Sequence, residues 1–425
     1  MNTNWAIRNA VLPGREGRWS ISIAAGLITD VSVDADFDAA CDLQAVWNAQ
    51  GRLVSPGFVD PHVHLDKALT GDRTADAVAA VDLNAAIRTV RQLKSDFTVE
   101  DVTRRARRGL EMGLAHGTTT ARTHCEADRF IGQRGVQGVQ AAARALAGLV
   151  DLQVIAFPQE GWFETAGSIE DGAGSYVAQA IEGGLRIVGG NINARLWPSD
   201  PERQVDETFA LAAKHGCDID YHLDNWDSAD AFTLPYVAQK TMAQGWQGRV
   251  AVSHIASLAH VNDAVAANTI DLLKKADVQV CVLPTRMRLT RVLELMEAGV
   301  NVSCGTDNMR DPFVRFGDAD PLKAMLLLAQ ITHQLHNAGL EKMWQTMTTN
   351  SARMLRLANH GLSAGCAADL VVLDARSAPE AVLLQAAKLA VVKSGAQVSG
   401  PLPVAPSKFP PPLFPSQSFI TPINI

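Results

Sequence analysis

The sequence predicts an α/β protein whose central part is a (β/α)8 barrel. Two observations favour this fold class: the alternation of strand-like with helical segments, and the presence of eight such units. Eight short runs rich in β-branched and other apolar residues alternate with longer segments of helical period; the runs are SPGFVDPHVHL, TTTARTHC, LQVIAFP, LRIVGG, DIDYHL, RVAVSHI, VQVCVLP and NVSCGTD. Strands that alternate with helices predict a parallel sheet, and eight such units favour closure into a barrel. An open doubly wound sheet is the alternative, but such sheets usually have fewer strands, and no Gly-rich phosphate loop follows the first run.

The segments between these runs are expected to be helices that cover the barrel. The clearest candidates have the apolar period of an amphipathic helix, and they are Thr98–His116, Val205–His215, Ala229–Gly245 and Thr290–Ala298.

The two ends of the chain predict a second, smaller region of β-structure. Strand-like pieces lie at Trp5–Leu12, Trp19–Ala24 and Leu27–Val33 and on the approach to Leu53, while ADLVVLDA and KLAVVKSG follow residue 367. Each end alone is a thin sheet with a face to bury, so we expect one β-sandwich built from residues 1–55 and 359–400. The barrel then occupies 56–358, and 401–425 is an irregular tail that holds eight of the 19 prolines.

Composition and charge narrow the functional class. The chain has 425 residues, of which 47% are hydrophobic and 20% charged, so it can bury a large core. A net charge of −7 disfavours nucleic-acid binding, and the basic run 104–108 is expected to be the solvated face of a helix. The six cysteines form no CxxC pair, the N-terminus shows no signal peptide, and no apolar run is long enough to span a membrane. We therefore expect a soluble, cytoplasmic protein.

Polar residues with metal-binding chemistry stand at the carboxyl ends of the predicted strands. They are His62 and His64 on the first strand, His124 on the second, His222 on the fifth, His254 on the sixth and Asp307 on the eighth. In a parallel barrel these ends converge on one face. A single histidine at a strand end is usually a satisfied polar residue, but the joint occurrence favours a metal site. Imidazoles with a carboxylate and an open position suit catalytic Zn²⁺ or Fe²⁺.

Such a site has a defined chemistry. A divalent ion lowers the pKa of a coordinated water from 15.7 to about 7, and the resulting hydroxide can add to the electron-poor carbon of an amidine or a lactam. Asp307 can accept the proton of that water as a general base, and His254 can orient the hydroxide or assist proton transfer.

The run VSPGFVDPHVHLDKALTGDR resembles the signature of the amidohydrolase superfamily, whose members are metal-dependent hydrolases on (β/α)8 barrels flanked by a β-sandwich. Within it, IAFPQEGWF, DIDYHLDNWD, RVAVSHIASL and CGTDNMRDPFVRFGDADPL are similar to the cytosine deaminase and N-isopropylammelide amidohydrolase branch. The resemblance spans roughly residues 5–395, and the motifs occur in the family's order. The Pro-rich C-terminus has no counterpart in it.

The resemblance implies roles for individual residues. It implies that one metal ion, Zn²⁺ or Fe²⁺, is bound by His62, His64, His222 and Asp307. It implies that His254 stands beside the metal-bound water and that Gln159 hydrogen-bonds a carbonyl of a heterocyclic substrate. Relatives with two metals hold a carboxylated lysine on the fourth strand, and LRIVGGNIN has none, so we expect a mononuclear site. Homo-oligomers are common among relatives, and we expect one here.

One departure from the family concerns the proton path. In cytosine deaminases the motif after the fifth strand is His-x-x-Glu, whereas here the residue at the glutamate position is Asn225. Asparagine can hydrogen-bond a substrate but cannot shuttle a proton at neutral pH. Either Asp224 or His254 then moves the proton, or the substrate needs no such proton. Cytosine is therefore disfavoured, and an N-substituted or otherwise modified heterocycle is favoured.

Further residues near these motifs have open roles. Trp162 and Trp226 either stack on a planar ring or simply pack, and His124 either contacts substrate or supports the metal ligands. Asp66 and Lys67 are as well suited to a structural role as to contact with substrate.

The predicted function is hydrolysis of a C–N bond of a pyrimidine- or triazine-like heterocycle with release of ammonia or an amine. The alternatives are ring opening of a lactam or imide, and a non-catalytic barrel that binds a small molecule.

Overall fold

The computed structural model describes residues 4–37, 43, 45–74, 83–163, 172–192, 201–230, 232–284 and 289–401. Its centre is an eight-stranded parallel sheet in which each strand pairs with the next one along the chain. The strands are β6 (Phe58–Val63), β7 (Thr118–Glu126), β8 (Asp151–Phe157), β9 (Ile187–Ile192), β10 (Asp218–Leu223), β11 (Val250–His254), β12 (Gln279–Val282) and β13 (Val302–Cys304). Each of the eight predicted runs forms one of these strands, so the nearly closed barrel is confirmed.

The last strand returns to the first at the point where the predicted site lies. Val63 forms a parallel bridge with Asp307, whose backbone N–H donates to the carbonyl oxygen of His62 at 2.9 Å. Gly305 allows this approach, because a Cβ atom at its position would lie 2.7 Å from the Cβ of His62. Closure of the barrel thus fixes Asp307 beside the His62–His64 pair.

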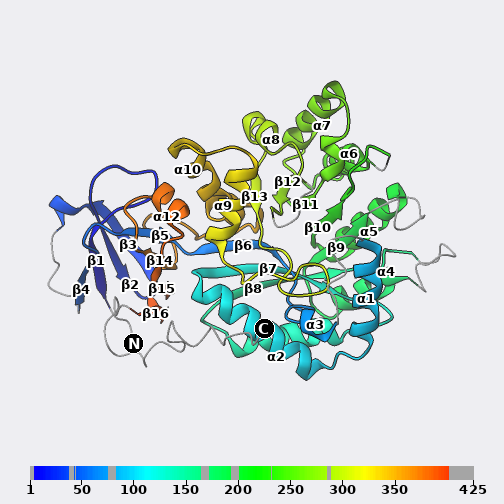
Figure 1. The fold of residues 1–425 in the computed structure, drawn as a ribbon, viewed down its shortest axis with the longest axis horizontal. Helices are drawn as coiled ribbons and strands as arrows, with labels where there is room; N and C mark the ends of the chain where they lie inside the picture. The colour runs from blue at the N-terminus through cyan, green and yellow to red at the C-terminus, as the bar shows by residue number, and fades with distance from the viewer. Residues whose placement is uncertain are drawn as a thin grey trace.

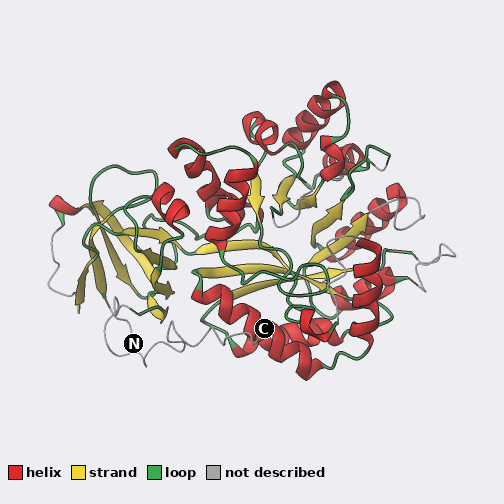
Figure 2. Cartoon of the chain, viewed as in Figure 1, coloured by secondary structure: helices red, strands yellow, loops and turns green. Residues whose placement is uncertain are grey.

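Helices surround the barrel strands, except the last helix in the chain, which packs on two other helices (Figure 2). They are α1 (Leu83–Ser95), α2 (Val99–Ala115), α3 (Arg134–Ala145), α4 (Ala173–Glu182), α5 (Pro201–His215), α6 (Leu234–Ala243), α7 (Asp263–Lys275), α8 (Val292–Ala298), α9 (Pro321–Ile331), α10 (Asn337–Thr346), α11 (Thr349–Met354) and α12 (Ala378–Leu384). Short 3₁₀ helices occur at Asp34–Asp36, Gly71–Arg73 and Ala256–Ala259. Three of the four predicted helices are confirmed with small shifts at their ends. The Thr98 side chain caps α2 by accepting from the N–H of Asp101.

The remaining predicted helix, Ala229–Gly245, begins later than expected. The sequence predicts a start at Ala229, but α6 starts at Leu234. Asp224 explains the difference, because its carboxylate accepts from the backbone N–H groups of Thr233 at 2.8 Å and Leu234 at 2.9 Å. Ser257 also donates to the carbonyl oxygen of Trp226 at 3.1 Å. These bonds hold the preceding chain as a loop.

Two four-stranded sheets lie beside the barrel (Figure 1). The first has the order β3-β2-β1-β4, with β1 (Trp5–Ala10), β2 (Trp19–Ala24), β3 (Leu27–Val33) and β4 (Ala45–Asn48). The second has the order β16-β15-β14-β5, with β5 (Leu53–Pro56), β14 (Leu370–Leu373), β15 (Lys388–Lys393) and β16 (Ala396–Ser399). In the second sheet β5 pairs antiparallel with β14, so the two ends of the chain meet there. Trp5, Ile21, Val54 and Val372 belong to one buried cluster that draws on both sheets.

The sequence also predicts an irregular C-terminal tail and no membrane-spanning segment. The Pro-rich tail lies outside the described residues from position 402 onward. Among the helices that are described, none combines the length and apolar character needed to cross a membrane.

Candidate metal centre

The predicted metal ligands converge at the carboxyl ends of the barrel strands. His62 lies in β6, His64 follows that strand, His222 lies in β10, and Asp307 follows β13. His254 ends β11. All five side chains are buried. Of the 11 histidines, the barrel brings together these four and His124, the five that the sequence places at strand ends.

The nitrogen and oxygen atoms of these residues face one another at short range. The Nε2 atoms of His62 and His64 lie 3.6 and 3.5 Å from Asp307 Oδ1. His222 Nε2 lies 3.2 Å from His64 Nε2. Two triads, His62–His64–Asp307 and His62–His222–His254, each have their ligand atoms within 4.8 Å of one another. Histidine nitrogens with a carboxylate at this spacing fit a single divalent ion.

Electrostatics keeps two of these imidazoles, those of His64 and His222, in the form that binds metal. Burial lowers the pKa of His64 well below its ordinary value, and the charge of Lys67 lowers it further. Burial and the neighbouring histidines lower the pKa of His222 in the same way. Neutral imidazoles have a free lone pair for an ion, so His64 and His222 can bind a metal ion at neutral pH.

Side chains behind the cluster orient its rings. His62 Nδ1 lies 2.9 Å from Ser253 Oγ, which leaves Nε2 facing Asp307. The ring of His124 lies next to those of His62 and His222, with centroids 4.1 and 4.4 Å away. Its Nε2 is 3.3 Å from Asp220 Oδ1, and Asp220 also accepts from Arg122 at 2.9 Å. Burial and the proximity of His62 lower the pKa of His124 to about 4, against the opposing charge of Asp220. His124 therefore contacts His62, and whether it also contacts substrate stays a prediction.

Two residues of the cluster have left-handed backbone conformations. The φ angle is +73° at His254 and +61° at Asp307. Such conformations cost energy for residues with a side chain and concentrate at functional sites. Here each one occurs where the chain turns away at the end of a strand and directs the side chain to the centre of the barrel mouth.

The loop after β10 holds three residues that the sequence associates with substrate. Asp224 uses one oxygen for the backbone of Thr233 and Leu234, as described above, and burial raises its pKa to about 7. Asn225 and Trp226 are half-buried. The Asn225 Oδ1 atom has no hydrogen-bond partner among the described residues. Asn225 Oδ1 and the second carboxylate oxygen of Asp224, Oδ1, therefore both have hydrogen-bonding capacity that the described residues do not use.

Gln159 and Trp162 follow β8 and have different surroundings. The Gln159 Oε1 atom lies 3.5 Å from Lys67 Nζ, and its carbonyl oxygen accepts from Asn191 Nδ2 at 2.8 Å. Trp162 is a member of the main hydrophobic cluster, and its carbonyl oxygen accepts from Gly174. Within the described part of the chain, its ring contacts none of the clustered histidines. Trp162 therefore packs in the hydrophobic core, and its stacking on a substrate ring stays a prediction.

Sequence reasoning missed two residues at the cluster and left a third undecided. Phe157 packs on His222 with ring centroids 4.3 Å apart. Asn308 follows Asp307 directly, is buried, and donates to Asp311 Oδ2 at 2.7 Å. Lys67, whose role the sequence left open, is buried with its Nζ 2.7 Å from Glu126 Oε1. Asn308 could have been found from the sequence, because it directly follows the predicted ligand Asp307. Phe157 could not, because its sequence context is that of any aromatic residue in a core strand.

A parallel barrel with clustered histidines and a carboxylate at its strand ends defines the class of barrel enzymes with a site for a divalent metal. The model of the amidohydrolase family matches residues 172–399. The chain belongs to the amidohydrolase family, as its motifs predict, and it is a hydrolase of carbon–nitrogen bonds other than peptide bonds.

Individual relatives agree with this assignment. The chain is 32% identical over 395 residues to N-isopropylammelide isopropyl amidohydrolase of Pseudomonas sp. strain ADP, covering 92% of this chain and 95% of the relative. It is 29% identical to pterin deaminase of Rhizobium rhizogenes, covering 92% and 90%. The crystal structure of 5-methylcytosine deaminase from Klebsiella pneumoniae with 5-fluorocytosine is 30% identical, covers 93% of this chain and 98% of that chain, and superimposes with a TM-score of 0.85.

Proposed function

We propose that this protein is a mononuclear aminohydrolase that removes ammonia or an amine from a nitrogen heterocycle. The observation that carries the proposal is the convergence of His62, His64, His222 and Asp307 around one point. These four residues would hold one Zn²⁺ or Fe²⁺ ion. When bound, such an ion acts as a Lewis acid and provides an activated water at neutral pH.

His254 and Asp307 are the proposed proton-handling residues. Asp307 Oδ1 lies within reach of two ligand nitrogens, so a water at the centre of the cluster would lie beside this carboxylate. His254 belongs to the same cluster and would orient the attacking water and stabilise charge at the reacting carbon. His124 would support the cluster through His62.

Polar groups around the cluster would select the substrate. Gln159 would hydrogen-bond a ring carbonyl, and Asn225 would bind a second polar group of the ring. Trp226 would cover one ring face, whereas Trp162 and Asp224 would shape the pocket from behind. Each unpaired buried polar group discriminates strongly against an analogue that lacks its partner.

The relatives support the class of substrate. Their names assign them N-isopropylammelide, a pterin and 5-methylcytosine, all of which are nitrogen heterocycles. Asn225 cannot shuttle a proton, so the substrate we favour has an N-substituted or otherwise modified leaving group rather than the plain amino group of cytosine.

A turnover screen tests the proposal. Metal-loaded protein is incubated with amino- and alkylamino-substituted pyrimidines, triazines and pteridines, and products are followed by ammonia assay and mass spectrometry. We expect release of ammonia or an amine with an oxo group in its place. Addition of one water without release of an amine would indicate ring opening of a cyclic amide instead. Tight binding without turnover across the panel, or a metal content far below one ion per chain, would indicate a non-catalytic barrel.

We also propose the domain division that the sequence predicts. Residues 56–358 would form the catalytic barrel, and residues 1–55 and 359–400 would form one β-sandwich. The pairing of β5 with β14 and the cluster shared by the two small sheets support this division.

A further inference from the structure

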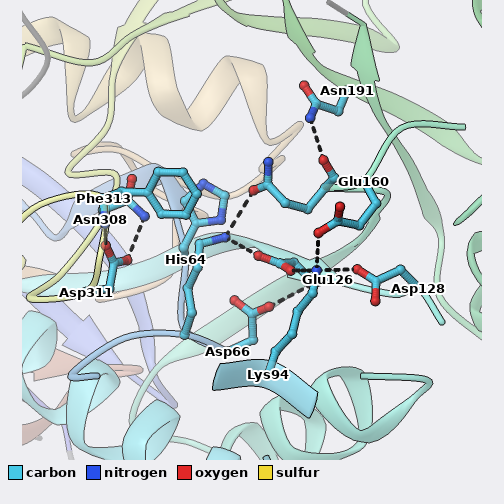
Figure 3. Close-up of polar contacts among 12 residues, drawn as sticks. His64, Asp66, Lys94, Glu126, Asp128, Glu160, Asn191, Asn308, Asp311 and Phe313 are labelled. Carbon is cyan, nitrogen blue, oxygen red and sulfur yellow. Dashed lines mark hydrogen bonds and ion pairs between the residues drawn. The ribbon is translucent and has the colours of Figure 1, made fainter. Parts of the chain in front are cut away.

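A group of buried charged residues lies beside the metal centre and takes no part in the roles above. Lys67, Lys94 and Glu126 are each only 1% exposed, and Asp66 and Asp128 are equally buried. The group joins α1 to the ends of β7 and β8 (Figure 3). Buried charges are costly unless they are paired, so this arrangement must hold its members in fixed positions.

Lys94 is the centre of the group. Its Nζ donates to Glu126 Oε2 at 2.6 Å, Asp128 Oδ2 at 2.5 Å and Glu160 Oε1 at 2.9 Å (Figure 3). These three bonds use all the donors of its ammonium group. Glu160 is also paired with Arg91. Of these carboxylates, Glu126 is the one that Lys94 shares with Lys67.

Glu126 divides its two oxygens between the two lysines. Oε2 accepts from Lys94, while Oε1 accepts from Lys67 Nζ at 2.7 Å. The backbone N–H of Glu126 donates to Asp66 Oδ2 at 2.8 Å. The carboxylate therefore has one available orientation, and the Lys67 ammonium is fixed by it.

The Lys67 ammonium in turn lies next to Gln159. Its Nζ is 3.5 Å from Gln159 Oε1, a long contact, and lies 5.8 and 5.4 Å from the ring centroids of Phe157 and Phe313. An ammonium group has donors only, so the amide must present its oxygen to Lys67 and not its NH₂ group. The Gln159 Nε2 atom is then left as a donor, and it has no hydrogen-bond partner within the described residues.

We propose that the Lys94–Glu126–Lys67 chain is a positioning relay that fixes the amide of Gln159 with Nε2 as the donor to substrate. The relay makes the site select heterocycles with a carbonyl oxygen at this position and reject those with hydrogen or an amino group there. Lys94 is a positioning residue and touches no reacting atom. This inference rests on the proposed function, because it specifies what the proposed substrate-binding residue Gln159 recognises.

The test compares binding of two probes that differ in one ring carbonyl and the ring N–H that accompanies it. Cytosine and 4-aminopyrimidine are titrated calorimetrically into Zn²⁺-loaded full-length protein. We expect wild type to prefer cytosine by about 100-fold, because a buried donor without a partner discriminates strongly. In Lys94→Gln the preference should fall to about tenfold or less as the amide becomes free to rotate. Lys94→Arg, which keeps the charge, should retain it.

A matched control separates the relay from a general loss of packing. Lys388 is another lysine with a largely buried side chain, 9% exposed, and it is paired with Asp320 at 2.8 and 2.9 Å; Lys388→Gln should leave the preference unchanged. If Lys94→Gln does not fold, Lys67→Gln decides the question, because it leaves Lys94 with its three carboxylates and should show the same loss. An unchanged preference in the folded variant, or a wild type that binds neither probe or both equally, overturns the relay. Wild type that prefers cytosine but turns over no compound in the screen overturns the proposed function and leaves the relay standing.

Discussion

His62 Nδ1 lies 2.9 Å from Ser253 Oγ, on the side of the ring opposite to Asp307. With Nε2 bound to the ion that we propose, Nδ1 would carry the proton and donate it to the serine oxygen. This bond fixes both the tautomer and the direction of the ring, which are properties that a metal ligand needs.

Ser253→Ala should therefore weaken metal binding without removing a ligand. Loss of such a supporting hydrogen bond lowers metal affinity by about 10- to 100-fold, which competition with a chelator measures. Ser303→Ala is the control, because Ser303 is an equally buried serine whose Oγ has no hydrogen-bond partner among the described residues. Equal affinities in the two variants would show that Ser253 does not orient His62.

His222→Ala should remove both metal and activity. His222 provides the nitrogen that lies 3.2 Å from His64 Nε2, so its loss opens one side of the cluster. The ion contributes several kcal/mol of transition-state stabilisation, and we expect turnover to fall by about 10³-fold or more. His215→Ala, at the end of α5, should keep both properties. Full metal content and activity in His222→Ala, measured by elemental analysis and the amine assay, would refute the ligand assignment.

Glu126→Gln should destabilise the protein in a pH-dependent way. Burial alone would raise the pKa of Glu126, but the charges of Lys67 and Lys94 outweigh it and lower the pKa to about 2. Because the folded pKa lies below the ordinary value of 4.5, the ionised carboxylate stabilises the fold above pH 4.5, and this contribution is lost as the pH falls towards 2. At pH 7 we expect a loss of about 3–5 kcal/mol in the free energy of unfolding, and the difference from wild type should narrow below pH 4.5.

Urea unfolding at several pH values measures this effect. Glu111→Gln is the control, because Glu111 pairs with Arg107, whose side chain is half exposed. That pair should contribute less than about 1 kcal/mol. If the difference in the free energy of unfolding between wild type and Glu126→Gln stayed constant from pH 7 to below 4.5, the ionised carboxylate of Glu126 would not be the source of the stabilisation.

The barrel and the clustered ligands could be predicted because both depend on local pattern and chain order. Each predicted strand has its own run of β-branched residues, and the carboxyl ends of parallel strands must share one face. His62 and His222 are far apart in sequence, yet their places at strand ends were enough to bring them together. The start of α6 could not be predicted, because it depends on the hydrogen bonds that the backbone N–H groups of Thr233 and Leu234 donate to the distant carboxylate of Asp224.

The buried charges could not be predicted for a related reason. Lys94 lies in the last turn of an amphipathic helix, where a lysine is ordinarily solvated, and its partners come from the end of β7 and from the segments that follow β7 and β8. The expectation of a solvated basic face was likewise wrong at Arg105. That residue is 4% exposed and donates to the carbonyl oxygens of Asp66 and Ala68 at 2.7 and 2.9 Å. Burial of a charge is decided by tertiary partners, and no single segment contains that information.

Asn225→Glu should increase deamination of substrates with an unsubstituted amino group. The native asparagine has an unpaired Oδ1 in the loop after β10 but cannot carry a proton to a ring nitrogen. A carboxylate at the same position can, and a positioned general acid–base contributes about 10²–10⁴-fold, so we expect ammonia release from cytosine to rise at least about tenfold. Asn225→Gln supplies the same side-chain length without an ionisable group and should show no gain. If Asn225→Glu shows no gain either while it still binds cytosine, then the shape of the pocket, and not the proton path, sets the choice of substrate.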